Sequence, residues 1–267
     1  MLRNRLLVVI IGLPIFIAVI AAGGWLFTLL MTAVLAIAAW EFWRLFSLGG
    51  FTPSRVVLIG GVIALALTRA WLGFEYADLI ATGLILVGMS VQVFRFARHP
   101  KTAATDFCIT LAGIFYLGWL GAFFFSLRDL PHGQWWFLVA LPAVWLADAG
   151  AFLFGRKFGR HRMAPLVSPN KTWEGYIGGI ITGTLLTVLL AALWQLAAPA
   201  IRIEVAAVLG LVIAMVTPLG DLGESMIKRQ FGVKDSSNIL PGHGGMMDRI
   251  DSWIWAAAIG YYLIMWL

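Results

Sequence analysis

Apolar runs that are each long enough to cross a bilayer constrain this chain more than any other feature of its sequence. A helix needs about 20 apolar residues to span the hydrocarbon core. Inside lipid, only helices and closed barrels satisfy the backbone, and continuous runs favour helices over the alternating pattern of barrel strands. The sequence therefore predicts an all-α, polytopic transmembrane helix bundle with about nine spans. The runs cover residues 5–22, 25–46, 55–73, 78–97, 104–127, 135–154, 173–196, 203–222 and 250–267.

The composition argues against a soluble protein and against a nucleic-acid partner. Hydrophobic residues make up 61% of the 267 residues and charged residues only 12%, whereas soluble domains carry about 25% charged residues. In a membrane protein, the net charge of +6 marks loop orientation and attracts anionic lipid headgroups. We therefore predict a lipid bilayer as partner and no nucleic acid. The single cysteine, Cys108, rules out an intrachain disulfide and a cysteine metal cluster.

The distribution of Lys and Arg predicts how the chain crosses the membrane. Successive loops alternate between the two sides of the membrane, and 16 of the 19 basic residues fall in the loops of one side. The three on the other side are Arg69, Arg128 and Arg202. Because cytoplasmic loops carry an excess of Lys and Arg, we expect a cytoplasmic N-terminus, an external C-terminus and a location in the inner cell membrane. We also expect one integral membrane domain over 1–267, with mainly structural spans in 1–130 and catalytic spans and loops in 140–267.

Acidic residues interrupt the apolar runs in the second half of the chain. Asp148 lies inside the sixth run, where a carboxylate is costly and indicates function, although an Asp paired with a neighbouring helix would also explain it. Asp221 and Glu224 stand three residues apart at the end of the eighth run. In the first half, the Trp40–Arg44 segment resembles an aromatic belt with a charge pair at the cytoplasmic interface, and a role of Glu41 in a site stays open.

The segment 168–175, SPNKTWEG, enters the seventh run. Ser168 or Thr172 can cap the helix that starts there, with Glu174 in its first turn. The free N–H groups of a helix start also suit a phosphate group, and Lys171 adds a full positive charge. Capping and phosphate binding explain this segment equally well when it is considered alone.

The most polar stretch of the chain runs from residue 225 to residue 251. It combines both charge signs with a glycine-rich turn, and Asp248 and Asp251 share a helix face because they stand three apart. The glycines allow positive φ and close approach to an anion, but a simple tight turn would need them too. Asp235 either belongs to the site or forms an ion pair with Lys234 or Arg229. The stretch contains Lys228, Arg229, Lys234, Asp235, Gly242, His243, Gly244, Gly245, Asp248, Arg249 and Asp251.

The predicted topology gathers these polar segments at the cytoplasmic membrane face. Clustered carboxylates favour a hard cation such as Mg²⁺, which completes its coordination with water and substrate phosphates. Basic residues nearby supply the other half of phosphate recognition. The residues therefore predict metal-dependent phosphoryl or nucleotidyl transfer at a bilayer surface. A zinc site at His243 lacks a second His or Cys at ligand spacing, and an ion path would step through the membrane instead of clustering at one face.

The stretch 225–251 resembles the signature of phosphatidate cytidylyltransferases, also called CDP-diacylglycerol synthases. That pattern begins Ser-x-apolar-Lys-Arg, continues through Lys-Asp and His-Gly-Gly, and closes on Asp-Arg-apolar-Asp. The segments 168–175 and 148–151 also resemble this family, whereas the first five runs match only in general character. The matching positions of the stretch are Ser225, Lys228, Arg229, Lys234, Asp235, Ser237, Leu240, Pro241, His243, Gly244, Gly245, Asp248, Arg249 and Asp251.

The resemblance implies that CTP and phosphatidic acid react to give CDP-diacylglycerol and pyrophosphate, for phospholipid biosynthesis. It implies Mg²⁺, with K⁺ as a second cation, and it suggests a homodimer, for which no residue argues. The expected metal ligands are Asp148, Asp221, Asp248 and Asp251. The expected phosphate-binding residues are Ser168, Lys171, Thr172, Lys228, Arg229, Lys234 and Arg249. We expect His243, Gly244 and Gly245 to shape the nucleotide pocket, with proton transfer by His243 as an additional role.

Two other functions stay open on the sequence. One is a cytidylyltransferase or CTP-dependent kinase that acts on another membrane lipid, such as a prenol or prenyl phosphate. The other is a transporter or lipid-binding protein that uses the same charges as a pathway. Transport predicts solute flux without release of pyrophosphate, and a different acceptor lipid would distinguish the two enzymes.

Overall fold

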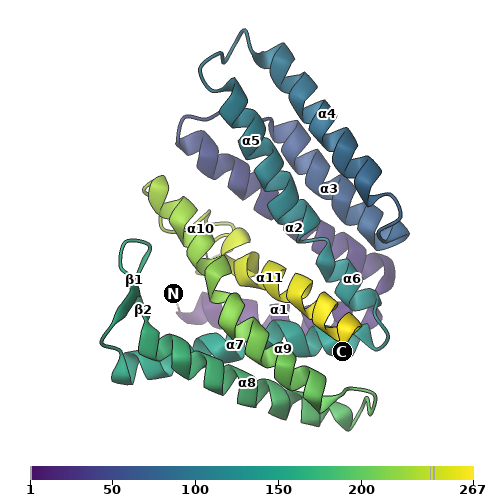
Figure 1. Cartoon of the computed structure of the whole chain (residues 1–267), viewed down its shortest axis with the longest axis vertical. Coiled ribbons are helices and arrows are strands. Elements are labelled where there is room, and N and C mark those ends of the chain that lie inside the picture. The colour runs from purple at the N-terminus through teal and green to yellow at the C-terminus, as the bar shows by residue number, and fades with distance from the viewer. Residues whose placement is uncertain (1, 241, 243) are drawn as a thin grey trace. The chain divides into compact units, whose positions relative to one another are not determined.

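The computed structural model describes residues 2–240, 242 and 244–267, and of residues 2–9 and 11 only the backbone. Most of the described part of the chain is helical (Figure 1). It divides into two compact units. The first unit contains Met1–Ser126 and Gln230–Arg249, and the second contains Leu127–Arg229 and Ile250–Leu267.

The first unit is a bundle of consecutive helices. The buried side chains of α2 recur every three or four residues, as in Phe27, Met31 and Leu35, so one face of this helix lies in the core. α2 packs against α3, and both contact the π-helical segment η1 (Figure 1). The elements are α1 (Leu2–Ala22), α2 (Gly24–Leu48), α3 (Arg55–Leu72), α4 (Ala77–Arg95), α5 (Ala103–Gly113), η1 (Ile114–Trp119) and the start of α6 (Phe123–Asp129).

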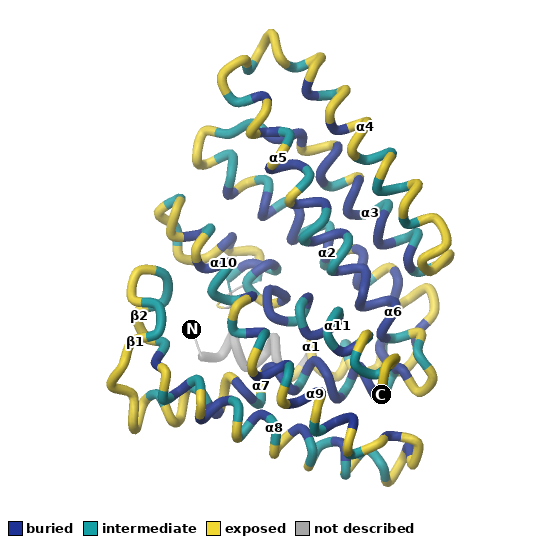
Figure 2. Tube along the Cα trace, in the orientation of Figure 1, coloured by how far each residue is buried: buried dark blue, intermediate teal, exposed yellow. Residues whose placement is uncertain are grey.

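α4 buries few of its residues (Figure 2). Only Gly88 and Gln92 are buried, whereas large apolar side chains such as Leu86 and Phe94 are exposed. A helix with apolar side chains on nearly all of its surface is stable in lipid but not in water. The exposure of α4 therefore fits a membrane-spanning segment.

A buried carboxylate fixes the connection between α2 and α3. Asp106 of α5 is fully buried. It accepts hydrogen bonds from Thr52 N, Thr52 Oγ1 and Thr102 Oγ1, each at 2.7 Å. Because several hydrogen bonds satisfy a buried carboxylate, Asp106 stabilises this loop of the first unit.

The second unit combines long helices with one hairpin. The strands pair antiparallel in the register Arg162↔Thr172 and Ala164↔Ser168. α8 packs along α7 and α9 (Figure 1). The elements are the end of α6, α7 (Gly133–Phe158), β1 (Arg162–Ala164), β2 (Ser168–Thr172), α8 (Trp173–Gln195), α9 (Ile203–Val216), α10 (Pro218–Gln230) and α11 (Met247–Trp266), whose first residues belong to the first unit.

Glycines at four-residue spacing allow α8 to lie directly against α7. Gly175, Gly179 and Gly183 are buried on one face of α8. A Cβ atom at Gly179 would lie 2.8 Å from the backbone oxygen of Ala147 and 2.9 Å from the Cβ of Ala151. Small residues at this spacing are typical of close helix pairs in membranes, where van der Waals contact drives association.

We expect Gly179→Val to lower the free energy of unfolding by about 1–3 kcal/mol, because the added atoms overlap the backbone of α7. The measurement is the thermal unfolding midpoint in detergent. Gly83→Val in α4 is the matched control, since no atom lies within 4 Å of a Cβ at that position. An equal midpoint for the two variants would show that the α7–α8 contact does not require glycine.

The predicted fold class is confirmed. All nine apolar runs are helical, and seven helices of the described part of the chain are long and apolar enough to cross a membrane. The number of nine spans and the cytoplasmic N-terminus stay predictions. One boundary is wrong, because the run 203–222 does not end as a single helix at residue 222. α9 ends at Val216 and α10 continues to Gln230.

Candidate active site

A proline break between α9 and α10 places Asp221 at the start of a helix. Pro218 has no N–H and cannot continue the hydrogen-bond ladder of α9. The break is stabilised by Thr217, whose hydroxyl donates to Ile213 O at 2.9 Å and whose carbonyl accepts from Ser252 Oγ at 3.2 Å. Asp221 therefore stands in the first turn of α10, where the helix dipole favours a negative charge.

Asp221 and Lys171 form an ion pair in the second unit. Lys171 Nζ lies 2.6 Å from Asp221 Oδ2, and both side chains are partly exposed. Ser225 Oγ donates to Asp221 Oδ1 at 3.2 Å. The ammonium group of Lys171 thus joins β2 to α10 and balances the Asp221 charge.

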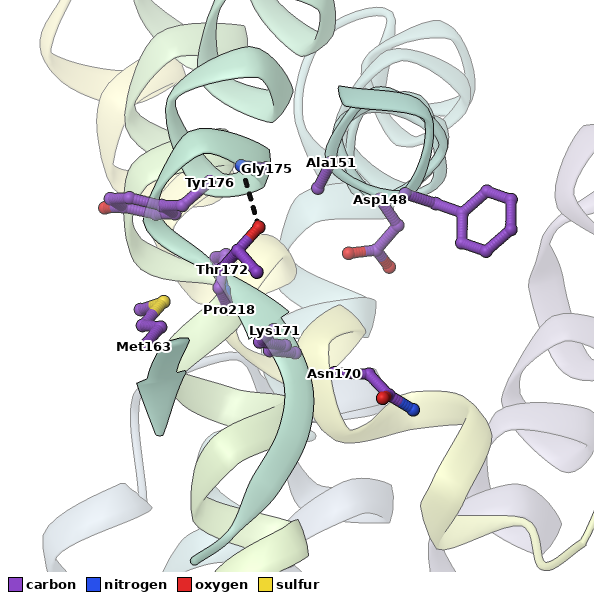
Figure 3. Close-up of a pocket in the computed structure, with 10 residues that line it drawn as sticks. Asp148, Ala151, Met163, Asn170, Lys171, Thr172, Gly175, Tyr176 and Pro218 are labelled. Carbon is purple, nitrogen blue, oxygen red and sulfur yellow. Dashed lines mark hydrogen bonds between the residues drawn. The ribbon is translucent and has the colours of Figure 1, made fainter. Parts of the chain in front are cut away.

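A cavity of about 210 Å³ opens beside this ion pair (Figure 3). The carboxylate of Asp148 projects from α7 toward the strand that carries Asn170 and Lys171 (Figure 3). Lys171 and Asp221 lie near enough for their charges to act on Asp148. The cavity thus combines an anionic and a cationic side chain with an apolar wall. Its lining residues are Asp148, Ala151, Phe152, Met163, Asn170, Lys171, Thr172, Gly175, Tyr176 and Pro218.

Two interactions fix the hairpin that carries Lys171. Thr172 caps α8, since its hydroxyl accepts from Gly175 N at 3.2 Å, which confirms one of the two predicted capping residues. Ser168 lies in β2 and does not cap the helix. Glu174 accepts a hydrogen bond from Arg160 N at 3.0 Å and lies 2.5 Å from His161 Nδ1.

A buried group of charges lies next to Asp221 on α10 and α11. Lys228 Nζ donates to Glu224 Oε2 at 2.9 Å, and both side chains are buried. Asp251 is also buried, and its carboxylate accepts a hydrogen bond from Ser252 N at 2.6 Å. It lies near enough to Asp221 and Lys228 to interact electrostatically with both. Within the second unit, Asp148 and Asp221 thus lie near Lys171, and Asp251 lies near Asp221 and Lys228. Their role as metal ligands stays a prediction.

The remaining predicted basic residues are more exposed than Lys171 and Lys228. Arg229 Nε donates to Val167 O at 3.4 Å, so it contacts the hairpin of the second unit. Lys234 and Arg249 are exposed and belong to the first unit. Their predicted phosphate-binding roles stay predictions.

The first unit contains the glycine-rich part of the signature. Asp248 Oδ2 accepts hydrogen bonds from Ser236 N at 3.0 Å and from Gly245 N at 2.7 Å. Gly244 has a φ of +82°, which favours glycine, and a Cβ there would lie 2.9 Å from Asp248 Oδ2. The turn is thus built around the Asp248 carboxylate. His243 lies outside the described residues.

The interpretation of Glu41 as part of an interfacial charge pair is wrong. Glu41 is fully buried and accepts hydrogen bonds from the Ser236 and Ser237 hydroxyls and from Met246 N and Met247 N. Arg44 instead lies over the Trp40 ring, 5.8 Å from its centroid. The only sequence signal for the contact between Glu41 and this segment was an acidic residue within an apolar run.

Two carboxylates of the second unit have the chemistry to hold a magnesium ion, and this metal stays a prediction. In residues 2–240, 242 and 244–267, no three His, Cys, Asp or Glu side chains are gathered as a ready-made metal site. Mg²⁺ typically uses only one or two carboxylates and takes its other ligands from water and phosphate oxygens. Asp221 and Asp251 supply such hard oxygen donors, and Lys171 already occupies a cation position beside Asp221.

Comparisons with known proteins cover almost the whole chain. The sequence model of the cytidylyltransferase family matches residues 3–267. A phosphatidate cytidylyltransferase of Synechocystis sp. is 31% identical over 300 residues, which cover 99% of this chain and 97% of that protein. Phosphatidate cytidylyltransferases of Bacillus subtilis and Staphylococcus epidermidis are 32% and 34% identical, and the alignments cover 98% and 95% of this chain. The chain therefore belongs to the cytidylyltransferase family.

Proposed function

We propose that this protein transfers a cytidylyl group from CTP to phosphatidic acid, which gives CDP-diacylglycerol and pyrophosphate for phospholipid biosynthesis. The observation that carries the proposal is the full-length similarity to proteins named phosphatidate cytidylyltransferase. The cluster of Asp148, Lys171 and Asp221 supports it, because carboxylates and a cation at one cavity suit phosphate chemistry.

The reaction needs positioning and charge neutralisation more than a base. A phosphatidate oxygen attacks the α-phosphorus of CTP and forms a new P–O bond. The bond between the α-phosphorus and the oxygen that bridges it to the β-phosphate breaks, and pyrophosphate leaves. The attacking oxygen is already anionic, so no strong base has to remove a proton. The Lys171 ammonium can exchange its contact with Asp221 for a phosphate oxygen, since its side chain is partly exposed.

Asp221 and Asp251 are the proposed primary ligands for Mg²⁺, with Asp148 beside them and K⁺ as a second cation. A bound Mg²⁺ would supply positive charge against the charge that develops on the departing pyrophosphate. Lys228 is held by Glu224 at 2.9 Å, so its proposed role is to balance the buried carboxylates and to orient Asp251. Asp248 stays a proposed ligand only because it matches the family signature.

The proposed location is the inner cell membrane, with the site at the cytoplasmic face, where CTP is available. The apolar helices support an integral multi-pass protein. The excess of Lys and Arg in alternate loops supports the orientation. A homodimer is part of the proposal only through family resemblance.

The acceptor lipid tests this proposal against the other enzymes. Purified protein in detergent receives CTP and Mg²⁺ with phosphatidic acid, a prenol or a prenyl phosphate, and the lipid products are separated. We expect a CDP-lipid with phosphatidic acid only. Product formation with a prenol alone, or solute flux in liposomes without pyrophosphate release, would replace the proposal by one of the other functions.

A further inference from the structure

α2 contacts the glycine-rich signature segment through a buried carboxylate. Glu41 stands 195 residues before Ser236 in the chain. Its carboxylate lies 3.0 Å from Ser236 Oγ and 2.5 Å from Ser237 Oγ, and it accepts from Met246 N at 2.9 Å and Met247 N at 2.6 Å. Both ends of the 236–247 segment therefore meet one side chain, which the first unit keeps fully buried.

The two backbone contacts lie at the start of α11. The first N–H groups of a helix have no partner within the helix and carry partial positive charge. Glu41 satisfies those of Met246 and Met247 with its two oxygens. Asp248 stands in the first turn of this helix, so a shift of the helix start would displace the Asp248 carboxylate.

Ser236 connects Glu41 to Asp248. The Ser236 hydroxyl lies 3.0 Å from Glu41 Oε2 and 3.0 Å from Asp248 Oδ2. Gly245 lies directly against Ser236 and Glu41, since a Cβ at this position would lie 1.9 Å from Ser236 Oγ and 2.6 Å from Glu41 Oε1. The glycine in this turn is therefore required by close approach to Glu41 and not only by flexibility.

An aromatic contact joins α2 to the chain just before the 236–247 segment. The Phe231 ring packs edge-on against Phe46, with centroids 5.1 Å apart. Gly49 makes room for Phe231, because a Cβ at residue 49 would overlap that ring. α2 therefore contacts this part of the first unit through Phe46 as well as through Glu41.

We infer that Glu41 is a positioning residue for the proposed reaction, which holds the 236–247 segment and the start of α11 so that the Asp248 carboxylate, a proposed metal ligand, stands in a productive position. The expected effect of Glu41 on kcat rests on the proposed function. Its expected effect on the protection of the segment from trypsin does not. Glu41 acts through Ser236 and α11 and does not touch substrate.

The test compares Glu41→Gln with wild type in detergent, well below the unfolding midpoint. A glutamine offers one acceptor oxygen where the carboxylate offers two, and it presents an NH₂ group to backbone donors. We expect kcat to fall about 100-fold with a smaller change in the KM for CTP, because misplacement of catalytic groups has effects of this size. We also expect trypsin to cleave faster after Lys234, with unchanged cleavage after Lys101.

Asp106→Asn is the matched control. It also removes a fully buried carboxylate that fixes a loop of the first unit. Among the described residues, this carboxylate accepts its hydrogen bonds from Thr52 and Thr102 and not from the 236–247 segment. We expect lower stability for this variant, with kcat and cleavage after Lys234 close to those of wild type. A near-normal kcat in Glu41→Gln, or an equal loss of kcat in Asp106→Asn, would overturn the inference.

Two further outcomes keep the inference separate from the proposed function. If wild-type protein forms no CDP-lipid, the proposed function fails, and cleavage after Lys234 alone decides whether Glu41 holds the segment. If Glu41→Gln does not fold, Ser237→Ala takes its place, because it removes a single donor to Glu41. Ser237→Ala is expected to lower kcat and to speed cleavage after Lys234 in smaller measure, and no change in either would overturn the inference.

Discussion

Replacement of Asp221 by asparagine is expected to lower the rate of CDP-lipid formation on the order of a thousandfold, close to complete loss. Asp221 contacts Lys171, accepts from Ser225, and lies in electrostatic range of Asp148 and Asp251. Its loss removes the carboxylate that all of these groups share. The side chain keeps its size, so the α10 helix should form as before. The measurement is kcat at saturating CTP and Mg²⁺.

Glu204→Gln is the control for Asp221→Asn. Glu204 stands in the first turn of α9 in the same unit, and its side chain is 81% exposed. This variant also removes one negative charge, and we expect it to retain wild-type kcat. Near-normal activity in Asp221→Asn would remove Asp221 from the metal site, and an equal loss in Glu204→Gln would show that net charge matters more than position.

Lys171→Met is expected to have the second largest effect, with kcat/KM for CTP lower on the order of 100-fold. Methionine keeps most of the length of the side chain but removes the charge that lies 2.6 Å from Asp221. Both proposed roles of Lys171, the balance of Asp221 and the contact with a phosphate oxygen, are lost together. Lys171→Arg should restore part of the activity if the charge is what matters.

The control for Lys171→Met is Lys157→Met, at the exposed end of α7. It removes a basic residue from the last turn of α7, and Lys157 is not one of the residues that line the cavity. We expect wild-type kcat/KM. If the two variants lose the same activity, the basic loop acts only as a general attraction for anionic lipid or nucleotide, and Lys171 has no specific role.

The sequence was sufficient to predict the helices and part of the candidate site. Apolar runs of spanning length have few stable alternatives in lipid, and all nine runs are helical. Asp148, Lys171 and Asp221 were expected together because the predicted topology places their segments at one membrane face. Their electrostatic contact within the second unit agrees with that expectation.

Other features depend on contacts that a linear pattern does not reveal. Glu41 was assigned to an interfacial pair because Arg44 stands one turn away, but burial against the Ser236–Met247 segment determines its partners. The end of the eighth run was misplaced because hydropathy does not register the break that Pro218 introduces. The glycine spacing of α8 was visible in the sequence, but its meaning depends on the fit to α7.

The fate of the CTP phosphates tests the central claim most directly. CTP labelled with radioactive phosphorus at the α position or at the γ position is incubated with phosphatidic acid, Mg²⁺ and the purified protein, and the lipid is extracted. We predict that the α label enters the lipid in equal amount to the pyrophosphate released, that the γ label stays in pyrophosphate, and that EDTA stops both. Transfer of the γ label to lipid would show a kinase, and α-label transfer that persists in EDTA would contradict the metal-dependent mechanism.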